Sequence, residues 1–250
     1  MKKRKGELSE AYRRSAEVTK KTIFALRLLT AAPVYAEYRG FRTVGHYSGG
    51  ASGMILMNYP GERIDRGYGC DFESCMGSLE RLIPPTLATP IDSITVVYDK
   101  LDDALRRHRE GGGFGGIETR EAIDQLLDYF QALEAIIQAE GSYQIALYAA
   151  VLLNSAKQGR ELAGTAVFDF VKDMHTLRNE VIHGRIDKVL DGRSKTKHKI
   201  TEIELFRHYI YQLAILYILN PDENGQHGLR LLGHRLALGE PVKVKTLREA

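Results

Sequence analysis

The sequence has no tryptophan, only two cysteines among 250 residues, and little excess of charge of either sign. Cys70 and Cys75 have no second pair and no histidine array nearby, so the spacing favours two reduced cysteines over a zinc site. A net charge of +3 with a pI near 8.7 permits a polyanionic partner without requiring one. The length of 250 residues allows one large domain or two small ones, and the 44% of hydrophobic residues is enough for a proper core.

Long hydrophobic runs are also missing. The most apolar stretch, residues 209–219, is far shorter than the roughly 20 residues of a membrane-spanning helix. Residues 23–33 resemble the apolar part of a signal peptide, but Arg27 interrupts them and the basic run at residues 2–5 is distant. We therefore expect a soluble, cytoplasmic protein with no membrane partner.

Apolar residues recur with helical spacing over most of the chain. This spacing predicts helices at residues 7–31, 72–83, 94–108, 118–140, 143–156, 202–219 and 229–238. Residues 38–70 are rich in glycine and tyrosine, which fits short strands or irregular loops better than helix. The resulting division is an N-terminal region of unknown role (1–90), a helical bundle (91–220) and a C-terminal short helix and tail (221–250).

Proline, glycine and capping residues predict where these helices end. Pro84 and Pro85 should stop the helix that begins at residue 72. Gly141 should end the helix over 118–140, and Ser142 should cap the next, which is apolar nearly all round and therefore expected at the centre. Thr201 with Glu204 suggests a capping box for the last bundle helix. The glycine-rich segments 45–53 and 111–116 are expected to be loops, since the first lacks the Lys-Ser/Thr ending of a phosphate loop.

Residues 168–185 hold the candidate site. Five apolar residues spaced three or four apart form one stripe of a helix: Phe168, Val171, Met174, Leu177 and Val181. The other face is polar and includes Arg178, Asn179 and His175, and Gly184 can adopt the left-handed conformation that ends a helix. Arg178 and His183 are about 140° apart on an ideal helix, but both reach one cleft if the last turn loosens.

An arginine beside a titratable histidine suits phosphate chemistry. The guanidinium of Arg178 can neutralise charge on a phosphoryl group, and the imidazole of His183 can transfer protons near neutral pH. No His-Glu-His or paired-aspartate spacing is present, so neither a metal nor another cofactor is expected.

The stretch from Leu177 to Gly184 (LRNEVIHG) resembles the signature helix of HEPN domains, in the form of the Apea-like branch. In that family an arginine, then a polar residue, and a few residues later a histidine form the motif, and Arg178, Asn179 and His183 match these three places. Upstream, residues 133–137 and 143–154 are similar to the preceding helical pair of the family. The resemblance covers residues 91–220 and implies a mainly α fold, a four- or five-helix bundle. It does not extend to residues 1–90, where the composition predicts a less regular region, irregular or α+β.

The resemblance implies a metal-independent endoribonuclease with a composite site at the interface of a homodimer, acting on RNA. His183 would transfer protons, Arg178 would bind phosphate, and Asn179 would orient the backbone or substrate. Family members often act in antiviral defence or toxin–antitoxin systems, which implies an antitoxin or another activating partner. Two alternatives stay open: a catalytically silent module that binds RNA or a nucleotide, and a structural or sensor domain.

The charged residues around the motif also have simpler interpretations. The polar loop 188–199 contains Arg193, Lys195, Lys197 and Lys199, which could hold RNA by charge alone or could be a solvated surface. The role of Arg178 could be limited to an ion pair with Glu180, Asp173 or Asp187. His183 could be limited to hydrogen bonds with the last carbonyls of its own helix. His175, one turn before Arg178, could be a second titrating group, but a surface residue is the interpretation that we favour.

Overall fold

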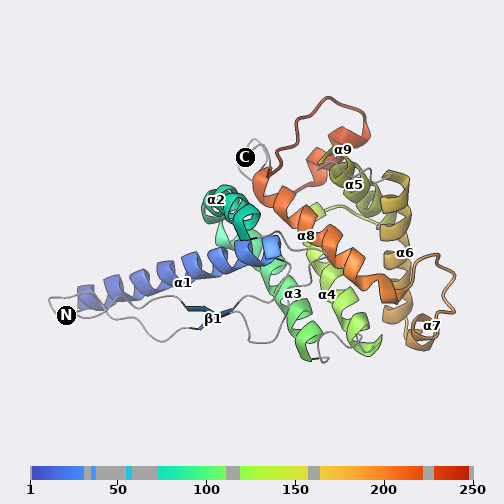
Figure 1. Ribbon diagram of the computed structural model, residues 1–250, viewed down its shortest axis with the longest axis horizontal. Helices are drawn as coiled ribbons and strands as arrows, with labels where there is room; N and C mark the ends of the chain where they lie inside the picture. The colour runs from blue at the N-terminus through green and yellow to red at the C-terminus, as the bar shows by residue number, and fades with distance from the viewer. Residues whose placement is uncertain are drawn as a thin grey trace.

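The computed structural model describes residues 2–30, 35–37, 55–57, 72–110, 119–156, 164–221 and 228–247, and most of these are helical (Figure 1). The elements in chain order are α1 (Lys2–Thr30), β1 (Tyr35–Glu37), β2 (Ile55–Met57), α2 (Phe72–Ala88), α3 (Ile91–Glu110), α4 (Thr119–Ile137), α5 (Ser142–Ser155), α6 (Gly164–Ile182), α7 (Ile186–Leu190), the 3₁₀ helix η1 (Ile200–Glu202), α8 (Ile203–Leu219) and α9 (Arg230–Ala237). The predicted mainly α fold is confirmed. The short strands pair antiparallel, with Ala36 opposite Leu56.

Helix α8 is the centre of the bundle. It packs against α1, α2, α4 and α5, and 12 of its 17 residues are buried because apolar side chains surround it on all sides. The sequence predicted this central place for residues 143–156. Helix α5 buries seven residues but leaves Tyr143 62% exposed, and it packs against both α6 and α9.

The N-terminal helices share the core of the bundle. Phe24 and Leu28 of α1 and Leu82 of α2 are buried in the same apolar cluster as α4, α6 and α8. Arg27 of α1 is buried and pairs with Asp102 of α3. The predicted boundary near residue 90 is a tight turn between α2 and α3, and the apolar core continues across it. The N-terminal half of α1 extends away from the other helices (Figure 1).

The predicted stop at Pro84 and Pro85 is wrong, because α2 continues through both prolines to Ala88. Proline removes a backbone donor and its ring crowds the preceding turn. Two threonines stabilise the last turn: Thr86 Oγ1 donates to the carbonyl of Leu82 at 2.6 Å, and Thr89 Oγ1 donates to the carbonyl of Pro85 at 2.8 Å. Each hydroxyl adds a hydrogen bond to a backbone carbonyl close to the prolines, which have no backbone N–H to donate.

The predicted end of α4 at Gly141 is also wrong. Helix α4 ends at Ile137, and Gln138 takes the left-handed conformation with φ 55°. Gly141 instead precedes α5 as its N-cap, with φ 81°, and Ser142 is the first helical residue rather than the cap.

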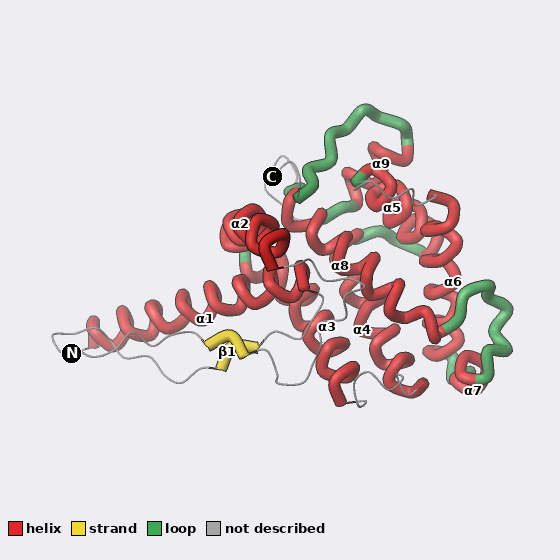
Figure 2. The backbone as a smooth tube through the Cα atoms, viewed as in Figure 1, coloured by secondary structure: helices red, strands yellow, loops and turns green. Residues whose placement is uncertain are grey.

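The predicted capping box of Thr201 and Glu204 lies too late in the chain. A 3₁₀ turn begins at Ile200, and the carboxylate of Glu202 accepts the N–H of Lys199 at 2.9 Å. Glu204 pairs with Arg207 one turn later. The short helix α7 was not predicted, and it occupies the start of the polar loop expected from residue 188. The loop itself begins after α7 and is the green segment before α8 in Figure 2.

The glycine-rich segments 45–53 and 111–116 and Cys70 lie outside the described residues. Within the described part of the chain, no single helix is long and apolar enough to span a membrane; only α4 and α5 together pass that test, and they are bent by 74° at their junction.

Candidate functional site

Helix α6 carries the predicted site and is fixed by an apolar stripe. Val167, Val171, Met174, Leu177 and Val181 are all buried. Phe170 adds an aromatic contact, since its ring centroid lies 5.5 Å from that of Tyr209 and 6.2 Å from that of Phe206, both on α8. The stripe predicted from the sequence is confirmed except at Phe168, which is only partly buried.

The end of α6 follows from Gly184. Its φ of 73° places it in the left-handed region, where glycine has no Cβ to clash. The N–H of Gly184 bonds to the carbonyl of Val181, and the N–H of Arg185 bonds to the carbonyl of Glu180. These two bonds form a Schellman motif, in which His183 is the C-cap. The predicted role of Gly184 is confirmed.

Arg178 is held between α4 and its own helix. Its Nη2 lies 3.4 Å from Oε1 of Glu134 on α4, and its Nη1 donates to Oδ1 of Asn179 at 3.2 Å. The side chain of Arg178 is 25% exposed and that of Glu134 is 40% exposed. At such exposure the pair contributes at most about 1 kcal/mol to stability, so its main effect is orientation. Arg178 therefore pairs with α4 and not with Asp173, Glu180 or Asp187.

Asn179 connects Arg178 to a histidine. Its Nδ2 donates to Nδ1 of His175 at 3.1 Å, which requires that ring nitrogen to be unprotonated. The imidazole of His175 packs edge-on against Phe130, with the centroids 5.7 Å apart. Burial, and then the positive charge of Arg178, lower the pKa of His175. His175 is thus part of a polar chain across two helices and not the surface residue predicted from the sequence.

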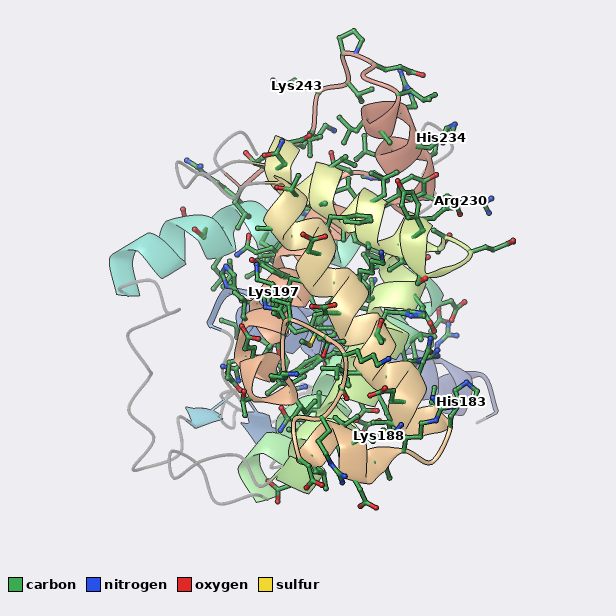
Figure 3. All side chains as sticks on the ribbon, turned by 90° about the vertical axis from the view of Figure 1, so that its right-hand side faces the viewer. His183, Lys188, Lys197, Arg230, His234 and Lys243 are labelled. Carbon is green, nitrogen blue, oxygen red and sulfur yellow. The ribbon has the colours of Figure 1, made fainter. Side chains whose placement is uncertain are left out.

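His183 differs from these three residues because it is exposed at the end of α6 (Figure 3). Its N–H bonds to the carbonyl of Asn179, as in a regular helix, but its imidazole has no hydrogen bond or ion pair with any described residue. The structure therefore brings Arg178, Asn179 and His175 together, while His183 lies one turn further along the chain. Exposed apolar residues flank it, since Ile182 is 55% exposed and Ile186 is 39% exposed.

The loop between α7 and η1 is anchored to α6 by carboxylates. Oδ2 of Asp173 accepts the backbone N–H groups of Lys197 and His198 at 2.9 and 3.0 Å. Oε2 of Glu180 accepts a hydrogen bond from the hydroxyl of Ser194, which is buried. The sequence pattern gave no sign of these contacts, because each joins residues more than ten positions apart.

The loop cations that were predicted to bind RNA fall into two groups. Arg193 pairs with Asp191, and Nζ of Lys199 donates to the carbonyls of Gly192 and Ser194 at 3.1 and 2.9 Å. Lys195 and Lys197 are exposed, and their ammonium groups have no partner among the described residues. Figure 3 shows Lys197 beside α6, and Lys188 near His183. Lys195 and Lys197 therefore remain available to a ligand, whereas Arg193 and Lys199 shape the loop.

Sequence reasoning missed Glu134, Asp173 and Glu180 as positioning residues. All three are acids on the polar faces of helices, where a solvated carboxylate is the usual interpretation. Within the described part of the chain, no group of three or more His, Cys, Asp or Glu side chains could hold a metal ion. Comparison with protein-family models, curated proteins and solved structures gave no significant match to this chain.

Proposed function

We propose that this protein is a metal-independent endoribonuclease of HEPN type, in which Arg178 and His183 act at a composite site between two copies of the chain. The observation that carries the proposal is an oriented guanidinium on α6 followed, five residues later at the helix end, by an imidazole that has no partner among the described residues. Glu134 and Asn179 hold Arg178 at one edge of the helix, while the ring of His183 is accessible. Lys195 and Lys197 add positive charge on the anchored loop beside α6.

The chemistry needs two proton transfers and one positive charge. A neutral imidazole of His183 takes the proton of the ribose 2′-hydroxyl, whose oxygen then bonds to phosphorus. The bond from phosphorus to the 5′-oxygen breaks, and a second, protonated imidazole gives that oxygen its proton. Arg178 neutralises the charge that builds up on the phosphoryl oxygens. The products are a 2′,3′-cyclic phosphate and a 5′-hydroxyl.

The reaction needs two imidazoles, and each copy of the chain supplies one exposed histidine at the end of α6, His183. A two-fold dimer would supply the second imidazole. The neighbouring residues support this arrangement. Ile182 and Ile186 are apolar, exposed and on either side of His183, which is where a contact between copies would bury them. The His183 of the second copy would then face the first across the substrate.

The test is cleavage of purified total RNA in EDTA by wild type, Arg178→Ala and His183→Ala. Wild type is expected to fragment RNA, and each variant is expected to lose at least about 100-fold in rate. Arg230→Ala and His234→Ala are matched controls, because both residues lie on α9 at the far end of the molecule from His183 (Figure 3). Circular dichroism should give the same helix content for all five proteins. Equal cleavage by all five would contradict the proposal.

One observation favours a second candidate, a catalytically silent RNA-binding module. The guanidinium of Arg178 already contacts Glu134 and Asn179, so it holds phosphate only with its remaining donors or by displacing Glu134. A silent module would bind RNA in a salt-sensitive way, lose affinity in Lys195→Ala/Lys197→Ala, and keep it in His183→Ala. A structural domain would show neither cleavage nor salt-sensitive binding.

A further inference from the structure

An exposed tyrosine and a partly buried phenylalanine form an aromatic pair at the opposite end of α6 from His183. Tyr143, at the start of α5, is 62% exposed and precedes the buried part of the helix, which begins at Ile145. Its ring meets that of Phe168 on α6 edge-on, with centroids 5.3 Å apart and planes at 71°. Phe168 is held against the core at its inner side. Tyr143 therefore presents a fixed aromatic ring to solvent, although an apolar side chain of this size is usually more covered.

Positive charge accompanies the pair. Nζ of Lys172, one turn after Phe168, lies 5.9 Å from the centroid of the Phe168 ring. The side chain of Lys172 is exposed, and its ammonium group forms no ion pair with a described residue. The ammonium group lies over the partly buried ring of Phe168, and the exposed ring of Tyr143 meets Phe168 edge-on. Together the three side chains offer the two features that bind single-stranded nucleic acid, a phosphate contact and a face on which a base can stack.

Phe168 and Lys172 lie on the side of α6 that leads to the proposed catalytic residue, His183. On an ideal helix, Lys172, Asn179 and His183 lie within about 60° of Phe168. The buried residues Met174, Leu177 and Val181 lie about 120° or more away from it. Phe168 and His183 are 15 residues apart, which is about 22 Å along the axis. A single strand lying along this face would meet Tyr143 and Phe168 a few nucleotides from the phosphate at His183.

We propose that Tyr143 and Phe168, with Lys172, form a stacking site for an unpaired base of single-stranded RNA. The inference rests on the proposed function and narrows its substrate to RNA whose bases are free to stack. A duplex hides its base faces, so it would gain nothing from this site. An aromatic contact is tolerant of sequence, because every base has a π face.

The test measures binding of a fluorescein-labelled 2′-O-methyl oligouridylate, which lacks the attacking hydroxyl and cannot be cut by the proposed reaction. Tyr143→Leu keeps the apolar surface but removes the ring, and should raise the Kd by about 5- to 100-fold. Tyr143→Phe keeps the ring, and its Kd should stay within about twofold of wild type. The same oligouridylate paired with oligoadenylate should bind wild type and Tyr143→Leu equally.

The other outcomes separate the two proposals. If Tyr143→Leu binds the single strand like wild type while Lys195→Ala/Lys197→Ala loses affinity, the stacking site is wrong and the RNA-directed function stands. If Tyr143→Leu weakens single strand and duplex alike, or changes the mass measured by light scattering without changing the affinity, the ring serves another contact and the inference is overturned. If wild type binds neither RNA, the proposed function fails and the stacking site fails with it.

Discussion

At the scale of single residues, His175 is the group whose titration reports on the site. Its pKa is lowered first by burial and second by the charge of Arg178. Arg178→Ala removes the second cause only, so the pKa of His175 should rise but stay below that of a free histidine. A chemical-shift titration of the ring by NMR measures this. An unchanged pKa in the variant would mean that Arg178 does not lie beside His175 in solution.

The same shift makes stability depend on pH. An unfolded histidine titrates near pH 6.5, and in the folded protein the lower pKa of His175 means that the native state binds fewer protons below that pH. Stability is therefore complete above about pH 6.5 and falls as the pH drops toward the folded-state pKa. His175→Gln should show a smaller loss between about pH 7.5 and pH 5.5. Urea unfolding of both proteins at the two pH values gives the comparison.

At the scale of elements, Asp173 connects α6 to the lysine loop. One carboxylate oxygen accepts two backbone N–H groups, those of Lys197 and His198. Asp173→Ala leaves both donors to solvent and should cost about 1–2 kcal/mol in the free energy of unfolding. The amides of Lys197 and His198 should exchange faster with deuterium. Asp169→Ala is the matched control, since Asp169 is exposed on the same helix. Equal exchange in both variants would contradict the anchoring.

The contact between α5 and α9 depends on a glycine. A Cβ at Gly233 would lie 2.8 Å from Cβ and 2.9 Å from Cγ of Tyr148, atoms that cannot move without the backbone of α5. Gly233→Ala should therefore destabilise the protein by about 1–3 kcal/mol. Gly77→Ala in α2 is the control, because nothing lies within 4 Å of its Cβ. It should stabilise by about 0.4–1 kcal/mol in the same thermal or urea melts. Equal effects at the two positions would contradict this packing.

The elements also show what a sequence can and cannot predict. Periodicity identified the longer helices, which bury apolar residues, but not the short α7 and η1. Gly184 ended α6 as expected. Helix ends depend on finer contacts: the hydroxyls of Thr86 and Thr89 bond backbone carbonyls at the end of α2, beyond its prolines, and Glu202 rather than Glu204 caps the last turn before α8. Arg178 and Asn179 lie together on α6 because they are adjacent in sequence, whereas His183 lies apart from them at the C-cap. Their partner Glu134 could not be predicted, because only packing brings α4 to Arg178.

At the scale of the whole molecule, the proposed chemistry makes activity a property of pairs of chains. If one site needs His183 from both copies, a mixed dimer of wild type and His183→Ala is inactive. With subunits exchanged at random in an equal mixture, about one quarter of the dimers are fully wild type, so activity per chain should fall to about one quarter of that of wild type. Chains acting alone would retain about one half. An equal mixture of wild type with Arg230→Ala should keep full activity, because Arg230 lies on α9, away from α6.

The measurement is the initial rate of RNA cleavage after subunit exchange, with native mass spectrometry counting the three kinds of dimer in the same sample. The rate should follow the fraction of fully wild-type dimer. Plotted against the fraction of wild-type chains in the mixture, the rate should therefore lie below a straight line at every intermediate ratio. A straight line would show that each chain carries a complete site. His175 would then be the remaining candidate for the second proton transfer, because it is the other histidine on α6 and Asn179 already connects it to Arg178.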